Sequence, residues 1–222
     1  MILQREECVM AQKAILFDLD GTLTDSGEGI MKCAQLALEH FGIHVADYHD
    51  LRVFVGPPLD MMFIKHGVPA DKTDEAIAVY RSRYLTVGKF ENFPYPGIPE
   101  MLDKLKKLGY KLYVATSKPE PPSVEIIEHF GLDQYFDRVC GATFDGSRSS
   151  KADVISYLLD LNGRADEVIM VGDTAFDVIG AKAHNIPCIG VAWGYGLVED
   201  MEKAGATAIA HTVDELYDLL QK

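Results

Sequence analysis

The sequence predicts an α/β fold, in which helices cover both faces of a parallel sheet and a helical cap is inserted after the first strand. Two observations lead to this prediction. From residue 98 onward, helical and strand patterns alternate along the chain, which is typical of a parallel sheet. Before residue 98, one short apolar strand is followed only by helical patterns.

The first strand is the apolar run from Ala14 to Phe17, which needs burial on both faces and therefore belongs in the sheet. It ends at Asp18 and Asp20, and Gly21 follows, where the backbone can turn sharply or approach a ligand closely. Open α/β sheets bind ligands beyond the carboxyl ends of their strands. Taken alone, the same residues fit an ordinary polar turn equally well.

The segment 25–93 shows helical spacing of its apolar residues and no convincing strand. We expect helices at 26–41, 59–66 and 73–87, while residues 51–55 are ambiguous. Gly56 and Pro57 interrupt the pattern ahead of the second of these helices. The proline- and glycine-containing stretch 93–97 predicts a stiff hinge. Residues 25–93 are therefore expected to form a cap over the end of the first strand.

The remaining elements follow in alternation after the hinge. We expect helices at 98–108, 123–130, 151–161, 175–184 and 213–220. We expect strands at 110–115, 138–142, 167–171, 187–191 and 206–210. The core domain is then residues 1–24 and 94–222, with the cap domain 25–93 inserted into it.

The composition is that of an ordinary globular enzyme, with 48% hydrophobic and 25% charged residues. A formal charge of −13 argues against partners such as nucleic acid or an anionic membrane, and no apolar run is long enough to cross a bilayer. Residues 1–13 lack a signal-peptide pattern and are expected to be a loose extension. The cysteines have no paired spacing, which favours reduced thiols in the cytoplasm: Cys8, Cys33, Cys140 and Cys188.

Acidic side chains follow a second predicted strand. Asp173 and Asp177 lie four residues apart at the start of the helix after strand 167–171, so both face the same side. An N-cap with an acidic first turn would look the same, and alone it would be the better interpretation. Together with Asp18 and Asp20, however, they place four carboxylates at one sheet edge. Such a cluster needs neutralising, and oxygen ligands favour Mg²⁺.

Two further strand ends carry groups suited to an anion. Thr116 and Ser117 end the strand 110–115, where hydroxyls and free backbone N–H groups can hold phosphoryl oxygens, although a simple turn fits as well. Lys151 stands in the first turn of a helix, where the helix dipole disfavours a cation. A lysine there can hold a carboxylate and an anionic ligand together, the alternative being an ordinary solvated lysine.

The order of these motifs resembles the haloacid dehalogenase-like hydrolase superfamily over the whole chain after the first dozen residues. The run from Asp18 to Thr22 fits its first motif, Thr116 the second, Lys151 the third, and Gly172-Asp173 through Asp177 the fourth. The resemblance implies a Rossmann-like core. The small helical cap between the first two motifs is similar to the phosphoglycolate phosphatase-like branch. The sequence segments 95–97, 114–119 and 145–149 are more similar to those of the bacterial 5′-nucleotidase-like members of this branch.

The resemblance also implies roles for the core residues. Asp18 would be the nucleophile that forms an aspartyl-phosphate, and Asp20 the general acid and then the base. An Asp at position 20 fits phosphatases in this superfamily and disfavours dehalogenase chemistry. Thr116, with backbone amides near Ser117, would hold the transferring oxygens, and Lys151 would screen charge.

For the metal, the resemblance implies Mg²⁺ held by Asp18, the backbone carbonyl of Asp20, and Asp173. Asp177 would act through water or by orienting Lys151. In the cap, the expected substrate contacts are Arg52 and the turn formed by Gly56 and Pro57, because a rigid turn can present backbone N–H groups over the site.

These inferences predict a Mg²⁺-dependent phosphatase of small phosphorylated metabolites, with a 5′-nucleotidase preferred to a phosphoglycolate phosphatase. A phosphosugar mutase would use the same aspartyl-phosphate but pass it to a sugar. A non-enzymatic phospho-acceptor module would need neither Asp20 nor a cap. We expect a monomer or a weak dimer in the cytoplasm.

Overall fold

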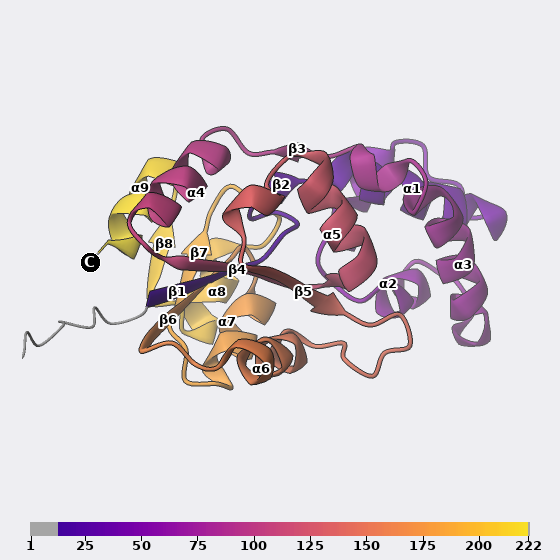
Figure 1. Cartoon of the computed structure of the whole chain (residues 1–222). Coiled ribbons are helices and arrows are strands. Elements are labelled where there is room, and N and C mark those ends of the chain that lie inside the picture. The colour runs from indigo at the N-terminus through magenta and orange to yellow at the C-terminus, as the bar shows by residue number, and fades with distance from the viewer. Residues whose placement is uncertain (1–12, 222) are drawn as a thin grey trace, which may run out of the picture.

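The computed structural model describes residues 13–221, which form a parallel sheet with helices on both faces, as predicted (Figure 1). The sheet has six strands in the order β5-β4-β1-β6-β7-β8. Their bounds are β1 Lys13–Phe17, β4 Lys111–Pro119, β5 Arg138–Ala142, β6 Glu167–Gly172, β7 Cys188–Val191 and β8 Ala208–Ala210. Strand β1 lies between β4 and β6, with Ile15 paired to Leu112 on one side and to Ile169 on the other.

The two faces of β1 explain its central position. Ile15 and Phe17 are buried in one hydrophobic cluster, and Leu16 is buried in a second cluster on the opposite face. The first cluster includes side chains of α4 Ile98–Lys107, α5 Glu120–His129 and α9 Val213–Leu220. The second includes side chains of α6 Lys151–Asn162, α7 Ala175–Lys182 and α8 Val198–Ala204. An all-apolar strand is therefore stable only inside the sheet, as the sequence predicts.

The inserted segment folds around a core of its own. It contains α1 Gly27–His40, the 3-10 helix η1 Tyr48–Phe54, α2 Leu59–Lys65 and α3 Thr73–Tyr84. Leu38, Phe54, Phe63 and Tyr80 are among its buried residues. The ambiguous stretch 51–55 thus lies mostly in a 3-10 helix. The inserted segment also contains two short 3-10 helices, η2 Ala70–Lys72 and η3 Gly88–Phe90. A third, η4 Asp133–Tyr135, lies outside it, between α5 and β5.

The connections between cap and core run side by side. Two-residue strands, β2 Thr24–Asp25 and β3 Phe93–Pro94, pair antiparallel where the chain enters and leaves the cap (Figure 1). They were not predicted, because two residues are too few to show a periodicity. The predicted hinge at 93–97 therefore begins as one half of a paired connection.

The other predicted elements are present, and two differences stand out. Strand β4 continues to Pro119, which pairs with Ala142 after a shift in register. Helix α8 was missed, because Met201 is its one buried residue and its sequence shows little periodicity. Among residues 13–221, every helix is too short or too polar to cross a lipid bilayer. The expectations for residues 1–12, including Cys8, lie outside the described residues.

Candidate active site

The predicted site residues lie at the carboxyl ends of three neighbouring strands. Asp18 directly follows β1, Asp173 follows β6, and Thr116 lies within β4. The backbone N–H of Asp18 donates to the carbonyl of Val171 at 2.9 Å, which extends the pairing of β1 with β6 to Asp18. The chain continues from β1 to β4 on one side and returns to β6 on the other. Open sheets bind ligands at such a point of reversal.

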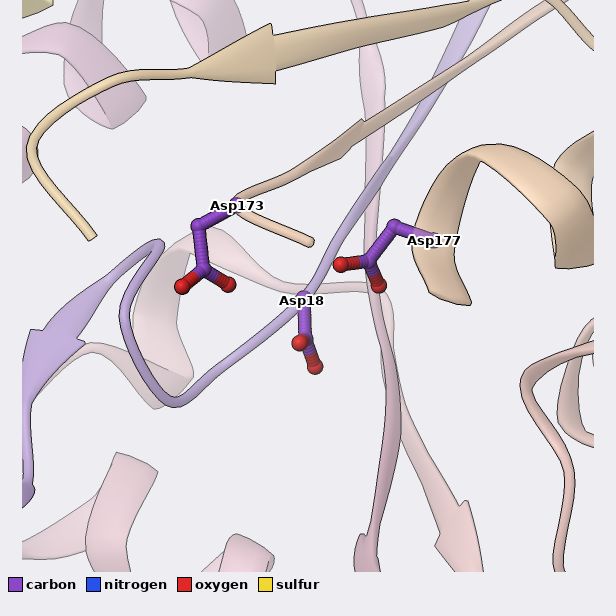
Figure 2. A group of neighbouring side chains, drawn as sticks. All are labelled: Asp18, Asp173 and Asp177. Atoms are coloured by element: carbon purple, nitrogen blue, oxygen red, sulfur yellow. The ribbon is translucent and has the colours of Figure 1, made fainter. Parts of the chain in front are cut away.

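Three carboxylates converge there. Asp18, Asp173 and Asp177 each offer an oxygen, and these oxygens all lie within 4.8 Å of one another. Figure 2 shows Asp173 and Asp177 on either side of Asp18. Lys151 joins the cluster from α6, with its Nζ 2.7 Å from Asp18 Oδ1 and 2.8 Å from Asp177 Oδ1. The structure therefore brings together residues from three separate parts of the chain.

Lys151 is fixed by burial as well as by charge. Its side chain is only 3% exposed, and its Nζ also donates to the carbonyl of Ala115 at 2.8 Å. Burial by itself would lower the pKa of Lys151, but Asp177 and Asp18 outweigh it and raise that pKa. The lysine is thus a permanently charged part of the site and not a solvated surface residue.

Asp173 is held in place by its neighbours. Its Oδ1 accepts from the hydroxyl of Thr22 at 3.3 Å, and its Oδ2 accepts from the backbone N–H of Tyr195 at 2.8 Å. Gly21 makes room for it: the backbone there has a φ of +81°, and a Cβ would stand 2.2 Å from Asp173 Oδ2. The close approach expected at Gly21 is present, directed at a carboxylate of the site.

The electrostatics of the cluster fit a divalent cation. Burial raises the pKa of Asp173, and the charges of Asp177 and Asp18 raise it further. Burial also raises the pKa of Asp18, against the opposing effect of Lys151. The cluster holds three carboxylates and one ammonium, so ionisation of all three leaves negative charge uncompensated in a largely buried site. Carboxylate oxygens are the ligands that Mg²⁺ prefers, and these residues fit that ion.

Asp20 makes a different contact, which the sequence reasoning missed. Its Oδ2 lies 2.5 Å from Nζ of Lys118, and this Nζ sits 4.8 Å from the ring centre of Tyr84 in the cap. Its Oδ1 is buried and has no hydrogen-bond partner within residues 13–221. The only available signal for Lys118 was its position two residues after Thr116, at the end of the same strand.

A cleft of about 720 Å³ opens between these core residues and the cap. Its lining includes Asp18, Asp20, Thr116, Ser117 and Lys151 from the core. From the cap it includes the Gly56–Pro57 turn expected to contact a substrate. The cap therefore covers the carboxylate cluster, as its insertion after the first strand implied.

Arg52 does not line this cleft. Its guanidinium donates to the carbonyl of Gly194 at 2.9 Å and stacks over the ring of Tyr195, 4.6 Å from the ring centre. The Tyr195 hydroxyl in turn hydrogen-bonds Asp25 and accepts from the backbone N–H of Gly27 at 2.7 Å. We call Arg52, Tyr195, Asp25 and Gly27 the lid contact. It joins the cap to the core loop that also holds Asp173, and a role of Arg52 in substrate contact stays a prediction.

Comparison with known proteins places this site in context. A family model described as haloacid dehalogenase-like hydrolase matches residues 15–191. A 5′-nucleotidase from Pseudomonas aeruginosa is 43% identical over 189 residues, which cover 84% of this chain and 86% of that protein. A protein of Mycobacterium tuberculosis named tyrosine-protein kinase PtkA is 41% identical over 209 residues, covering 93% of this chain and 72% of that one. The crystal structure of a predicted phosphatase from Clostridium acetobutylicum superposes with a TM-score of 0.90 at 45% identity, covering 95% of this chain and 98% of its own.

Proposed function

Because the chain belongs to the haloacid dehalogenase-like hydrolase family, we propose that it is a Mg²⁺-dependent phosphatase of small phosphate monoesters. The observation that carries the proposal is the convergence of Asp18, Asp173 and Asp177 at one end of the sheet, where Lys151 pairs with Asp18 and Asp177. A polar turn or a helix cap alone would not require these residues to meet. A nucleophilic carboxylate that approaches a phosphate dianion does require this concentration of compensating charge.

The residues that would hold Mg²⁺ are Asp18, Asp173 and the backbone carbonyl of Asp20. When bound, the ion supplies positive charge that offsets the repulsion between carboxylates and phosphate. Asp177 helps to position Lys151, because one of its oxygens contacts the Lys151 ammonium and the other caps α7. Lys151 supplies the protein's own cation, placed against the nucleophile.

In the first step, an oxygen of Asp18 attacks phosphorus and the bond from phosphorus to the leaving oxygen breaks. Asp20 donates a proton to that oxygen, so an alcohol departs. Thr116 is buried beside Asp18, and Ser117 is exposed to the cleft. We assign these two residues to holding the transferring oxygens.

In the second step, water attacks the phosphorus of the aspartyl-phosphate, and Asp20, now ionised, takes a proton from it. The bond to Asp18 breaks, inorganic phosphate leaves, and the carboxylate is restored. Residues 25–93 act as a lid domain on the core 1–24 and 94–222. The lid keeps bulk water out during the first step and, through the Gly56–Pro57 turn, faces the leaving group.

The relatives favour 5′-nucleotides over phosphoglycolate as substrates, since the 5′-nucleotidase is 43% identical to this chain and a phosphoglycolate phosphatase from Agrobacterium fabrum is 32% identical. The relative named as a tyrosine-protein kinase supports a second candidate, transfer of the phosphoryl group to an acceptor other than water. A phosphosugar mutase would belong to the same class. Asp20 beside Asp18 argues against a non-enzymatic phospho-acceptor module, because only a second step, to water or to another hydroxyl, needs a base. Rapid release of inorganic phosphate is what separates hydrolysis from transfer.

The test is a screen of phosphorylated metabolites with and without Mg²⁺, in which released inorganic phosphate is measured. Asp18→Asn should lose nearly all turnover and still fold, while Asp103→Asn, at a half-exposed ion pair on α4, should match the wild type. ATP with a tyrosine peptide, and a pair of sugar phosphates, are included to detect transfer. Phosphate release that survives Asp18→Asn, or transfer without phosphate release, would contradict the proposal.

A further inference from the structure

The cleft is larger than the reacting phosphate needs, even with the lid in place. The lid contact joins cap and core through Arg52 and Tyr195, so the volume of about 720 Å³ is that of a docked lid. Ligand sites of several hundred Å³ usually receive molecules of drug size. Most of the cleft is therefore available to the leaving group.

The walls of this space carry apolar side chains that remain exposed. Phe144 follows β5 and is 43% exposed, while Phe176 and Ile179 of α7 are 50% and 57% exposed. Phe176 and Ile179 stand three residues apart, so they lie on the same side of the helix. Ile77 and Leu85 add apolar surface from the cap. Apolar surface gathered in a functional cleft indicates a ligand with an apolar part.

Two of the three cations that line the cleft are paired with carboxylates. Among residues 13–221, the cations that line it are Arg81, Lys118 and Lys151. Lys118 pairs with Asp20, and Lys151 pairs with Asp18 and Asp177. The guanidinium of Arg81 lies over the ring of Phe144, 4.9 Å from its centre. The cleft thus offers stacking surfaces, and neither lysine is free to receive a second anionic group such as a carboxylate.

We propose that the preferred substrates are phosphate monoesters whose leaving group carries a planar aromatic ring, bound against Phe144, Phe176 and Arg81. Planar rings stack on aromatic side chains and on guanidinium planes. This inference rests on the proposed phosphatase function. Two kinds of substrate carry such a ring: a mononucleotide, through its base, and phosphotyrosine, through its phenol ring. The experiment below distinguishes them.

The test compares substrates that differ by the ring. We expect adenosine 5′-monophosphate to exceed ribose 5-phosphate in kcat/KM by at least about tenfold if the source is a nucleotide. We expect phosphotyrosine to exceed phosphoserine by a similar factor if the source is a phenol. Ratios within about twofold in both pairs, or a preference for phosphoglycolate, would overturn the inference while leaving the phosphatase proposal intact.

Substitutions at Phe144 and Phe176 test whether these side chains bind the ring of the substrate. Phe144→Ala and Phe176→Ala remove half-exposed side chains, so both proteins should fold, and each should reduce the advantage of the ring-bearing substrate several-fold. The rate with the ring-free partner should fall much less than the rate with the ring-bearing substrate. Leu108→Ala, similarly exposed on the core outside the cleft, is the control and should change neither rate. Equal losses with both substrates would contradict a ring-binding role.

Binding separates the two proposals. In Asp18→Asn, calorimetry should show tighter binding of the ring-bearing ester than of its ring-free partner in the presence of Mg²⁺. If no ester is hydrolysed by the wild type but this difference persists, the phosphatase proposal fails and the ring site stands. If hydrolysis occurs and the difference is absent, the ring site alone is wrong.

Discussion

Asp177 shows how one carboxylate can serve the fold and the site together. Its Oδ2 accepts from the backbone N–H of Thr174 at 3.1 Å and from the Thr174 hydroxyl at 2.8 Å, which forms the capping arrangement of α7. Its Oδ1 lies 2.8 Å from Lys151. The helix-cap interpretation of Asp177 is confirmed, and the functional one stays a prediction that is compatible with it, because each uses a different oxygen.

Removing the buried cation should destabilise the protein strongly. Lys151→Met takes one positive charge from between Asp18 and Asp177 and leaves both carboxylates without compensation. Such losses cost about 3–5 kcal/mol of unfolding free energy. Urea unfolding without Mg²⁺ measures the change, with Lys203→Met, 72% exposed, as the control expected to stay within about 1 kcal/mol. A loss for Lys151→Met no greater than the control's would show that the cluster is not held by this ion pair.

Asp20 can be tested through the leaving group. We expect Asp20→Asn to lower kcat by about 10²–10⁴-fold for an alkyl phosphate, whose alkoxide needs a proton to depart. With p-nitrophenyl phosphate the first step needs no such proton, so rapid-mixing experiments should show a burst of p-nitrophenol followed by slow turnover. Asp103→Asn again provides the control. An equal loss with both esters and no burst would argue against the acid and base roles.

At the scale of an element, the loop between β7 and α8 links the lid to the carboxylates. The backbone N–H of Tyr195 holds Asp173, while its ring and hydroxyl meet Arg52, Asp25 and Gly27 of the lid contact. One residue therefore touches both the candidate metal site and the cap.

Tyr195→Phe should separate these two functions. It removes the hydroxyl contacts to the cap and keeps the backbone N–H that holds Asp173. Each of the two lost hydrogen bonds is worth about 1 kcal/mol, so we expect KM to rise by up to about thirtyfold with the apparent affinity for Mg²⁺ unchanged. Thermal-shift titration measures the Mg²⁺ affinity. Tyr217→Phe on α9 is the matched control, and an unchanged KM in Tyr195→Phe would show that the lid docks without this contact.

At the scale of the whole molecule, the acidic side chains with the strongest effect on pH-dependent stability are the few that burial removes from water, Asp18 and Asp173. Burial raises the pKa of Asp173 to about 8 and that of Asp18 to about 6, from ordinary values of 3.8. The metal-free folded protein therefore keeps protons that the unfolded chain has released. Stability from these groups is complete below about pH 4 and is lost as the pH rises toward 8.

Mg²⁺ should remove this dependence by replacing the protons. We expect the free energy of unfolding to fall between pH 4 and pH 8 without Mg²⁺ and to fall less with it. At a concentration one hundred times Kd, binding adds about 2.7 kcal/mol. Denaturant unfolding at several pH values measures both effects, and Asp173→Asn should weaken them. A Mg²⁺ effect of the same size in Asp173→Asn would place the ion elsewhere.

Much of the fold could be predicted from the sequence. The apolar run ending at Asp18 predicted a buried strand followed by ligand groups, and the alternating pattern after residue 98 predicted the parallel sheet. The paired connections β2 and β3 and helix α8 were not predictable, because their few residues carry no periodic signal. The spacing of apolar residues indicates which side of a helix or strand is buried, and an element of only a few residues is too short to show such a spacing.

The sequence by itself determined the fold class, the inserted cap and the identity of the acidic and basic groups, since these follow from local patterns and motif order. Only the tertiary structure decided their partners: Lys118 with Asp20, and Arg52 with the Gly194–Tyr195 loop instead of the cleft. It also decided which apolar side chains stay exposed between cap and core. The physical reason is that a contact depends on where two distant segments meet, and no local pattern encodes the distance between them.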